Sequence, residues 1–224
     1  MNKQILLNKI SEVTEINPLK IRNVYIFGSR VYGCNTDTSD IDICVVGTHL
    51  LAHQEWKIPS VDIEGFGNVA LNIHMYTNDS FKEMVYNKNI MAIECLMASE
   101  EFKIKEDIKF ELDISDRKKL AAAILESSCG AWGRAKYKMA QGEIKKGLKN
   151  AYHAIRIMEF GLQLVKHGKI VNFAKANKWK KKIVDSDALR WRDLKDLCIA
   201  HKLRLQELLI SFCEEQGDNT IYSE

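Results

Sequence analysis

The chain has 224 residues, 46% hydrophobic and 28% charged, which is enough for one large or two small globular domains. No apolar run approaches the ~20 residues of a membrane-spanning helix, and the start MNKQILLNKISEV lacks the apolar core of a signal peptide, so we expect a cytoplasmic protein without membrane contact. The net charge of +3 is split, because residues 1–112 carry 11 Lys and Arg against 16 Asp and Glu, whereas residues 113–224 carry 22 against 14.

The first half reads as helices mixed with strands. Apolar spacing over residues 2–16 predicts a short amphipathic helix that ends near Pro18. Strands are predicted at NVYIFGS and IDICVVG, and VDIEGF-GN-VALNIHMYT reads as two strands joined by a tight turn at Gly67-Asn68. Residues 80–99 have a helical pattern.

From about Asp116 the strand-like segments disappear. Helices are expected at roughly 116–140, 144–168 and 186–214, the first capped by the SDRKK segment and the second ended by Gly168. The predicted fold is α+β: a mixed sheet with flanking helices over residues 1–112, followed by a basic C-terminal helical bundle over residues 113–224 that completes a cleft. The six cysteines include no CxxC pair and are read as reduced thiols.

The stretch IFGSRVYGCNTDTSDID holds the most specific pattern in the chain. Asp40 and Asp42 are two residues apart at the start of a strand, so their side chains share a face with about 6.6 Å between Cα atoms. Two carboxylates so placed can bind the divalent ions of a phosphoryl-transfer site. Gly28 lets a phosphate approach the backbone and Ser29 adds a hydroxyl donor, as in other anion cradles.

Gly-Ser, a gap of ten residues and Ser-Asp-x-Asp resemble the signature of the polymerase-β-like nucleotidyltransferase superfamily. GSRVYG and TSDID are most similar to the small nucleotidyltransferases found beside RNA-repair ligases. The resemblance extends through NIHMYTNDSF and, more loosely, through residues 132–170 with a His-x-x-Arg. It implies transfer of a nucleoside monophosphate from an NTP, ATP or CTP, to a hydroxyl with Mg²⁺ or Mn²⁺ as cofactor and pyrophosphate as product.

One departure concerns the third carboxylate that the superfamily usually places on a later strand. That position falls here on Asn72 or on His74, and neither is an acid. His74 can bind a metal through neutral imidazole, although Mg²⁺ prefers oxygen ligands. Asp62 or Glu64 on the preceding strand can supply the missing carboxylate instead. If none does, the protein is expected to bind nucleotide and catalyse poorly.

Two further segments carry candidate residues. His153 and Arg156 share a helix face, where they can grip a triphosphate or form structural contacts. The stretch KIVNFAKANKWKKKI holds six lysines and no acids, which suits either RNA phosphates or a solvated surface. We predict nucleotide contacts at Gly28, Ser29, Arg30, Ser39, His153 and Arg156, and RNA contacts at Lys178, Trp179, Lys180, Lys181 and Lys182.

The preferred acceptor is an RNA or tRNA end. A small molecule or a partner protein is an alternative acceptor within the same enzyme class. A nucleotide- or RNA-binding module without catalysis is the alternative from another class, because the third acid is missing. An interaction protein that docks a partner through its helical half is the weakest of these hypotheses.

Overall fold

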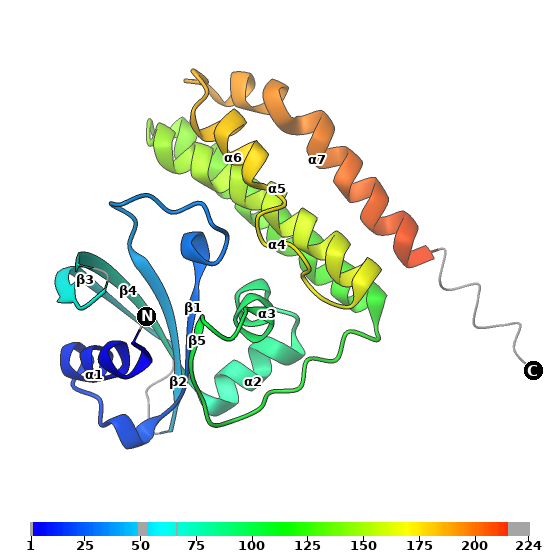
Figure 1. The fold of residues 1–224 in the computed structure, drawn as a ribbon. Helices are drawn as coiled ribbons and strands as arrows, with labels where there is room; N and C mark the ends of the chain where they lie inside the picture. The colour runs from blue at the N-terminus through cyan, green and yellow to red at the C-terminus, as the bar shows by residue number, and fades with distance from the viewer. Residues whose placement is uncertain (1, 49–52, 66, 215–224) are drawn as a thin grey trace, which may run out of the picture. The chain divides into compact units, whose positions relative to one another are not determined.

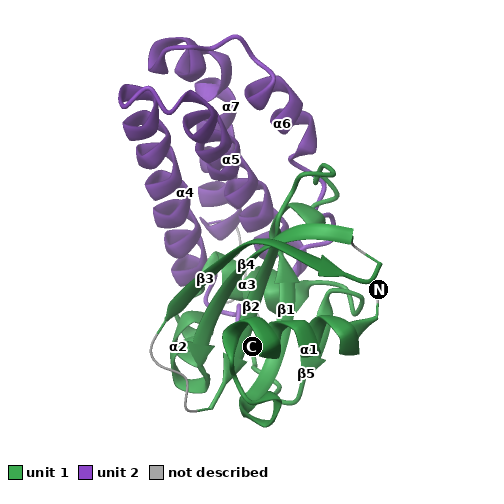
Figure 2. Ribbon diagram, turned by 90° about the vertical axis from the view of Figure 1, so that its left-hand side faces the viewer, with its two compact units in different colours: residues 1–112 green, residues 113–224 purple. Residues whose placement is uncertain are grey.

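The computed structural model describes residues 2–48, 53–65 and 67–214. The chain divides into two compact units, Met1–Leu112 and Asp113–Glu224, which Figure 2 shows in different colours. The first unit mixes strands with helices and the second is built from helices (Figure 1), so the expected α+β class with a C-terminal helical region is confirmed.

The first unit is built on a five-stranded mixed sheet with the order β3-β4-β2-β1-β5 (Figure 1). Only the central pair β2–β4 is parallel among the described pairings, and the others are antiparallel. The strands are β1 (Ile21–Phe27), β2 (Ile41–Gly47), β3 (Gln54–Ile63), β4 (Gly67–Thr77) and β5 (Lys103–Glu106). The strands expected at NVYIFGS and IDICVVG are confirmed as β1 and β2.

Strand β2 divides its residues between two cores. Ile41, Ile43 and Val45 lie in one apolar cluster together with Leu6 and Ile10 of helix α1 (Lys3–Thr14). The alternate residues Cys44 and Val46 belong to a second cluster, which includes Phe81 and Val85 of helix α2 (Asn78–Tyr86). Because side chains alternate along a strand, Asp42 lies on the same face as Cys44. The buried strand therefore fixes the direction of this carboxylate.

Several boundaries differ from those expected. The single helix expected over residues 80–99 is wrong, because Lys88 adopts a left-handed conformation (φ 58°) and the chain forms α2 and then α3 (Ile90–Met97). The Asn89 side chain accepts hydrogen bonds from the first-turn amides of Met91 and Ala92 and so starts α3 as a new helix. The helix expected over residues 2–16 is confirmed as α1, which ends at Thr14.

The β3–β4 hairpin is also displaced from its expected position. Its turn lies at Glu64 and Gly65, whereas Gly67 and Asn68 are already the first residues of β4. Strand β3 begins at Gln54, well before the expected VDIEGF, because it lies at the sheet edge and exposes alternate side chains, which weakens its apolar signal. Strand β5, four residues long, was not expected.

The second unit contains four helices in its described part, α4 (Arg117–Ala140), α5 (Ile144–His167), α6 (Asn177–Val184) and α7 (Trp191–Glu214). The expected cap is confirmed, since the Asp116 carboxylate accepts from the amide of Lys119, and Gly168 ends α5 with φ 70°. Helices α4 and α5 approach closely at Gly161, where an added Cβ would lie 2.4 Å from Ile124. None of the described helices is long and apolar enough to cross a membrane.

Candidate active site

The two aspartates lie at the start of β2, next to the end of β1. Asp42 is the second residue of β2 and Asp40 directly precedes the strand. In the antiparallel β1–β2 pair, Asp42 is opposite Phe27, the last residue of β1. The turn that follows, Gly28 and Ser29, is thereby brought beside the Asp-x-Asp segment. The structure thus brings together the two halves of the motif.

The missing side chain of Gly28 leaves space for the Asp42 carboxylate. The φ of Gly28 is 78°, in the left-handed region that favours glycine, and an added Cβ would lie 2.2 Å from Asp42 Oδ2. We expected this glycine to give room to a phosphate, and the structure adds a second reason for it. The turn itself, Gly28–Arg30 (η2), is a single turn of 3-10 helix, so no α-helix begins at the Gly-Ser pair.

Arg30 ties the Gly-Ser turn to the loop that leads into the aspartates. Its Nη2 donates to the carbonyl of Ser39 (2.9 Å) and its Nε to the carbonyl of Asp40 (3.4 Å). Ser39 in turn closes the preceding turn, because its hydroxyl accepts from the Thr36 amide at 2.9 Å. These contacts hold Asp40 in place from both sides of the motif. The nucleotide contacts expected of Arg30 and Ser39 stay predictions.

Asn72 occupies the position next to Asp42 on β4. The parallel register pairs the two residues, and Asn72 Nδ2 donates to Asp42 Oδ1 at 3.1 Å. The same Nδ2 lies 3.1 Å from Nε2 of His74. His74 pairs with Cys44, two residues further along each strand. Of the two positions considered for the third acid, Asn72 is therefore the direct neighbour of the aspartates.

His74 lies on the same face of β4 in a half-buried, aromatic setting. Its ring stacks on His53 with centroids 5.9 Å apart and meets Phe27 edge-on at 5.6 Å. Burial is the main cause that lowers the pKa of His74, so the imidazole is favoured in its neutral form. Since Asn72 Nδ2 can only donate, Nε2 of His74 acts as the acceptor in this contact.

Asp62 lies away from Asp42. It pairs with Asn68 near the tip of the β3–β4 hairpin, four residues from Asn72 along β4, which is about 13 Å of strand. Strand β3 is also separated from β2 by β4. The structure therefore does not bring Asp62 beside Asp42, and Glu64 lies still further along, in the hairpin turn.

The residues present suit an open Mg²⁺ site, with few protein ligands, better than a site in which every ligand comes from the protein. No group of three or more His, Cys, Asp or Glu side chains suited to a metal exists among the described residues. The oxygen donors are instead Asp40, Asp42 and the buried Asn72 Oδ1, which receives no hydrogen bond from the described part of the chain. Mg²⁺ commonly takes one or two carboxylates and completes its shell with phosphate oxygens and water. That requirement matches this donor set.

In the second unit, His153 and Arg156 are in contact, as their spacing predicts. Arg156, a residue that is 8% exposed, bonds through Nη2 to His153 Nδ1, and its guanidinium lies 5.6 Å from the centre of the Tyr152 ring. Burial, and then the charge of Arg156, hold the pKa of His153 well below its usual range. His153 is therefore neutral at pH 7, and its expected role in nucleotide binding stays a prediction.

The lysine-rich segment forms helix α6. Within it, the Trp179 ring stacks on His201 of α7 with centroids 4.1 Å apart, and Lys182 Nζ lies 4.7 Å from the indole centre. The indole that we expected to stack on a base thus already has ring and cation contacts inside the unit. The lysines at 178, 181 and 182 are exposed and that at 180 is half-buried, which suits contact with phosphates.

Two buried acids were not recognised from the sequence. Glu94 is 3% exposed and accepts a hydrogen bond from the Tyr32 hydroxyl. Glu159 is 6% exposed and lies 3.7 Å from His201 Nε2 in the second unit, where burial raises the pKa of the Glu159 carboxyl. Neither has a local sequence signal, because both partners come from distant segments.

The structure places the Gly-Ser turn next to the Asp-x-Asp pair on neighbouring strands, as the sequence motif predicts. In agreement, residues 8–94 match the family described as "Polymerase beta, Nucleotidyltransferase". The matched segment contains the Gly-Ser turn, both aspartates and Asn72. The first unit is therefore similar to polymerase-β-type nucleotidyltransferases over residues 8–94.

Two solved structures are similar to the whole chain at 10% identity. One is a nucleotidyltransferase-like protein from Exiguobacterium sibiricum, with 95% of this chain and 77% of that chain covered and a TM-score of 0.37. The other is an aminoglycoside 6-adenyltransferase from Bacillus subtilis, with 98% and 97% covered and a TM-score of 0.34. No curated protein is significantly similar.

Proposed function

We propose that the protein transfers a nucleoside monophosphate from an NTP to an acceptor hydroxyl and releases pyrophosphate. The observation that carries this proposal is the contact between the two halves of the motif, where Gly28 leaves room for the Asp42 carboxylate. Gly28 has a left-handed conformation and leaves space for the Asp42 carboxylate beside the turn. This close approach supports the proposal that Asp40 and Asp42 together bind a nucleotide-bound metal.

In this proposal Asp40 and Asp42 hold Mg²⁺ or Mn²⁺. When bound, the ion neutralises the phosphates and the charge that develops on the leaving pyrophosphate. The chain's own residues keep the acids in position. Arg30 fixes the loop at the Ser39 and Asp40 carbonyls, and Asn72 donates to Asp42, which restrains the orientation of the carboxylate.

Asn72 gives the alternative hypothesis its specific support. With an amide in place of the third acid, the site carries one negative charge fewer beside Asp42, so a second divalent ion binds less tightly. The acceptor hydroxyl also lacks a neighbouring carboxylate to receive its proton. A protein that binds nucleotide and turns over slowly, or not at all, is the second candidate function.

The acceptor that the sequence favours is an RNA or tRNA end, with ATP or CTP as the nucleotide. Support for it comes from the exposed lysines of α6, since clustered lysines can neutralise nucleic-acid phosphates. The Trp179 contact with His201 removes part of the support, because base stacking would require an accessible ring face. Small-molecule and protein acceptors are the variants that remain within the same reaction class.

The test is release of pyrophosphate with Mg²⁺ or Mn²⁺ and each of the four NTPs, with a mixed RNA pool or a neutral polyol such as myo-inositol as the acceptor. Asp42→Asn removes the charge and keeps an oxygen to accept from Asn72, so we expect a folded protein with at least a hundredfold slower release. Asp79→Asn, at an exposed aspartate in the first turn of α2, is the matched control and should keep its activity. Equal rates in the two variants would overturn the proposal. No release together with NTP-dependent stabilisation would establish the binding function instead.

A further inference from the structure

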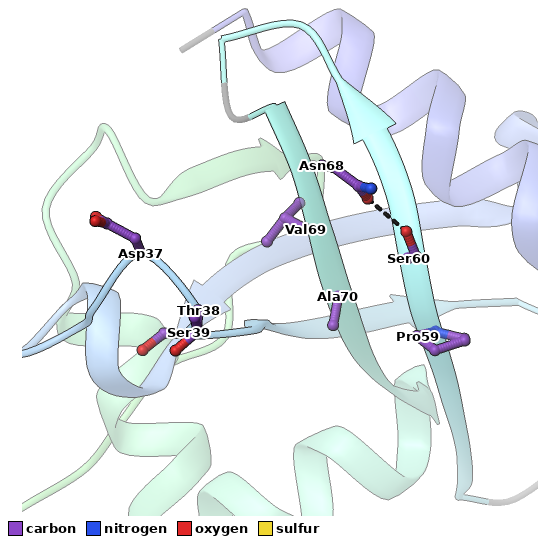
Figure 3. A pocket seen from close by; sticks show the side chains of 8 residues that line it. All are labelled: Asp37, Thr38, Ser39, Pro59, Ser60, Asn68, Val69 and Ala70. Atoms are coloured by element: carbon purple, nitrogen blue, oxygen red, sulfur yellow. Dashed lines mark hydrogen bonds between the residues drawn. The ribbon is translucent and has the colours of Figure 1, made fainter.

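We propose that a polar pocket beside Asp40 binds the acceptor, and that the acceptor is a neutral sugar or cyclic polyol; this inference rests on the proposed nucleotidyl transfer. The pocket has a volume of about 250 Å³ and is open to solvent on one side. Figure 3 shows its lining, which comes from the loop before β2 and from β3 and β4: Asp37, Thr38, Ser39, Pro59, Ser60, Asn68, Val69 and Ala70.

The pocket adjoins the catalytic aspartates through the backbone. Three of its lining residues, 37–39, directly precede Asp40 in the chain. On the opposite wall, Ala70 precedes Leu71, whose register partner on β2 is Ile41, so Ala70 is level with Asp40 across the parallel pair. A hydroxyl on a ligand in the pocket would therefore lie at the Asp40 end of the motif.

The polar groups of the lining suit hydroxyls and not phosphates. Thr38 and Ser60 contribute hydroxyls and Asp37 contributes a carboxylate, whereas no lysine, arginine or histidine lines the pocket. The Ser39 hydroxyl is already bonded to Thr36 within the loop. Carboxylates accept hydrogen bonds from hydroxyl groups and repel anions. The nearby Arg30 guanidinium donates to the Ser39 and Asp40 carbonyls and is not part of the lining, so a phosphorylated ligand would face Asp37 without a lining cation.

Ser60 and Asn68 are already oriented toward a ligand of this kind. The Ser60 hydroxyl donates to Asn68 Oδ1 at 2.5 Å, as the dashed line in Figure 3 marks. Asn68 is thereby left with its NH₂ group as donor, and Ser60 with oxygen lone pairs as acceptor. The pair can serve one hydroxyl that both donates and accepts.

The size of the pocket decides between acceptor and nucleotide. Sites for drug-sized ligands usually measure about 300–1,000 Å³, so this pocket holds one ring and not a whole nucleoside triphosphate. The accessible lining is mostly polar, since Pro59, Val69 and Ala70 contribute little exposed apolar surface. The expected ligand is therefore a single uncharged ring that carries several hydroxyl groups.

The test is binding of myo-inositol, a neutral cyclic polyol, to the full-length ¹⁵N-labelled protein, with inositol monophosphate as the charged counterpart. We expect saturable amide shifts at Thr38, Ser60 and Asn68, with at least tenfold weaker binding of the phosphate. Ala70→Leu fills the pocket and should weaken inositol binding at least tenfold. Ala122→Leu, on an exposed position of α4, is the matched control and should leave the binding unchanged.

If Ala70→Leu does not fold, Asn68→Ala serves as the second variant, with the same expected loss. Absence of saturable shifts, preference for the phosphate, or unchanged binding in the pocket variant would each overturn the inference. The titration contains no NTP, so it is independent of the proposed function. Inositol binding without pyrophosphate release would refute the transferase alone, and release without inositol binding would refute the pocket assignment alone.

Discussion

Replacement of Gly28 by alanine tests whether a glycine is required at this position because any side chain would collide with Asp42. Two costs add in Gly28→Ala. The left-handed φ of 78° costs a non-glycine residue about 1–2 kcal/mol. The new Cβ, 2.2 Å from Oδ2, must push the Asp42 carboxylate away from Asn72, and loss of a hydrogen bond to a charged group costs about 1.5–3 kcal/mol. The free energy of unfolding should therefore fall by about 2.5–5 kcal/mol.

Gly33→Ala is the matched control for the backbone cost. Gly33 also has a positive φ, 63°, but an added Cβ there meets no atom within 4 Å. We expect this variant to lose only about 1–2 kcal/mol. The difference between the two variants isolates the collision with Asp42.

The assay is amide hydrogen exchange at Ile43 and Val45 in β2, which reports the free energy of unfolding of the first unit by itself. A double-mutant cycle with Asp42→Ala completes the test, because that truncation removes the atoms closest to the new Cβ. The alanine at position 28 should then cost about as much as the one at position 33. If Gly28→Ala matches Gly33→Ala in the otherwise unchanged protein, the reasoning is refuted.

Three further outcomes are expected. Asn72→Asp, which supplies a third carboxylate, should tighten Mn²⁺ binding in calorimetry and raise pyrophosphate release at least tenfold; unchanged affinity would contradict the assigned register. Because the folded state holds the pKa of His153 below its unfolded value of about 6.5, stability should fall as pH drops below that value, and His153→Gln should flatten the dependence of melting temperature on pH. Alanines at residues 180–182 should weaken RNA binding and reduce its salt dependence, and identical binding isotherms would assign these lysines to a solvated surface.

The motif could be predicted from the sequence because its information is local. Two apolar strands, a Gly-Ser turn and alternating acids lie within one short stretch, and strand periodicity alone orients Asp42. The same holds for the caps of the long helices, where Asp116 and Gly168 act on their own neighbours. Local chemistry also allowed the first strands to be placed correctly.

What could not be predicted depends on pairing between distant segments. The assignment of Asn72 as the neighbour of Asp42 follows from the register of β4 on β2, and the remoteness of Asp62 follows from the same register. The stacking of Trp179 on His201 likewise joins two helices that the sequence does not link. The break at Lys88 was missed because α2 and α3 both continue the same apolar periodicity.

The parallel pairing of β2 with β4 has a consequence for how the protein becomes active as it folds. Asp42 and Asn72 are 30 residues apart, and β3, which pairs with β4, lies between them in the chain. Short-range hairpin contacts form faster than contacts that close a long loop. The β3–β4 hairpin is therefore expected to form first and then to dock on β2, so the site is completed late. Refolding protein should regain its strands before it regains nucleotide binding.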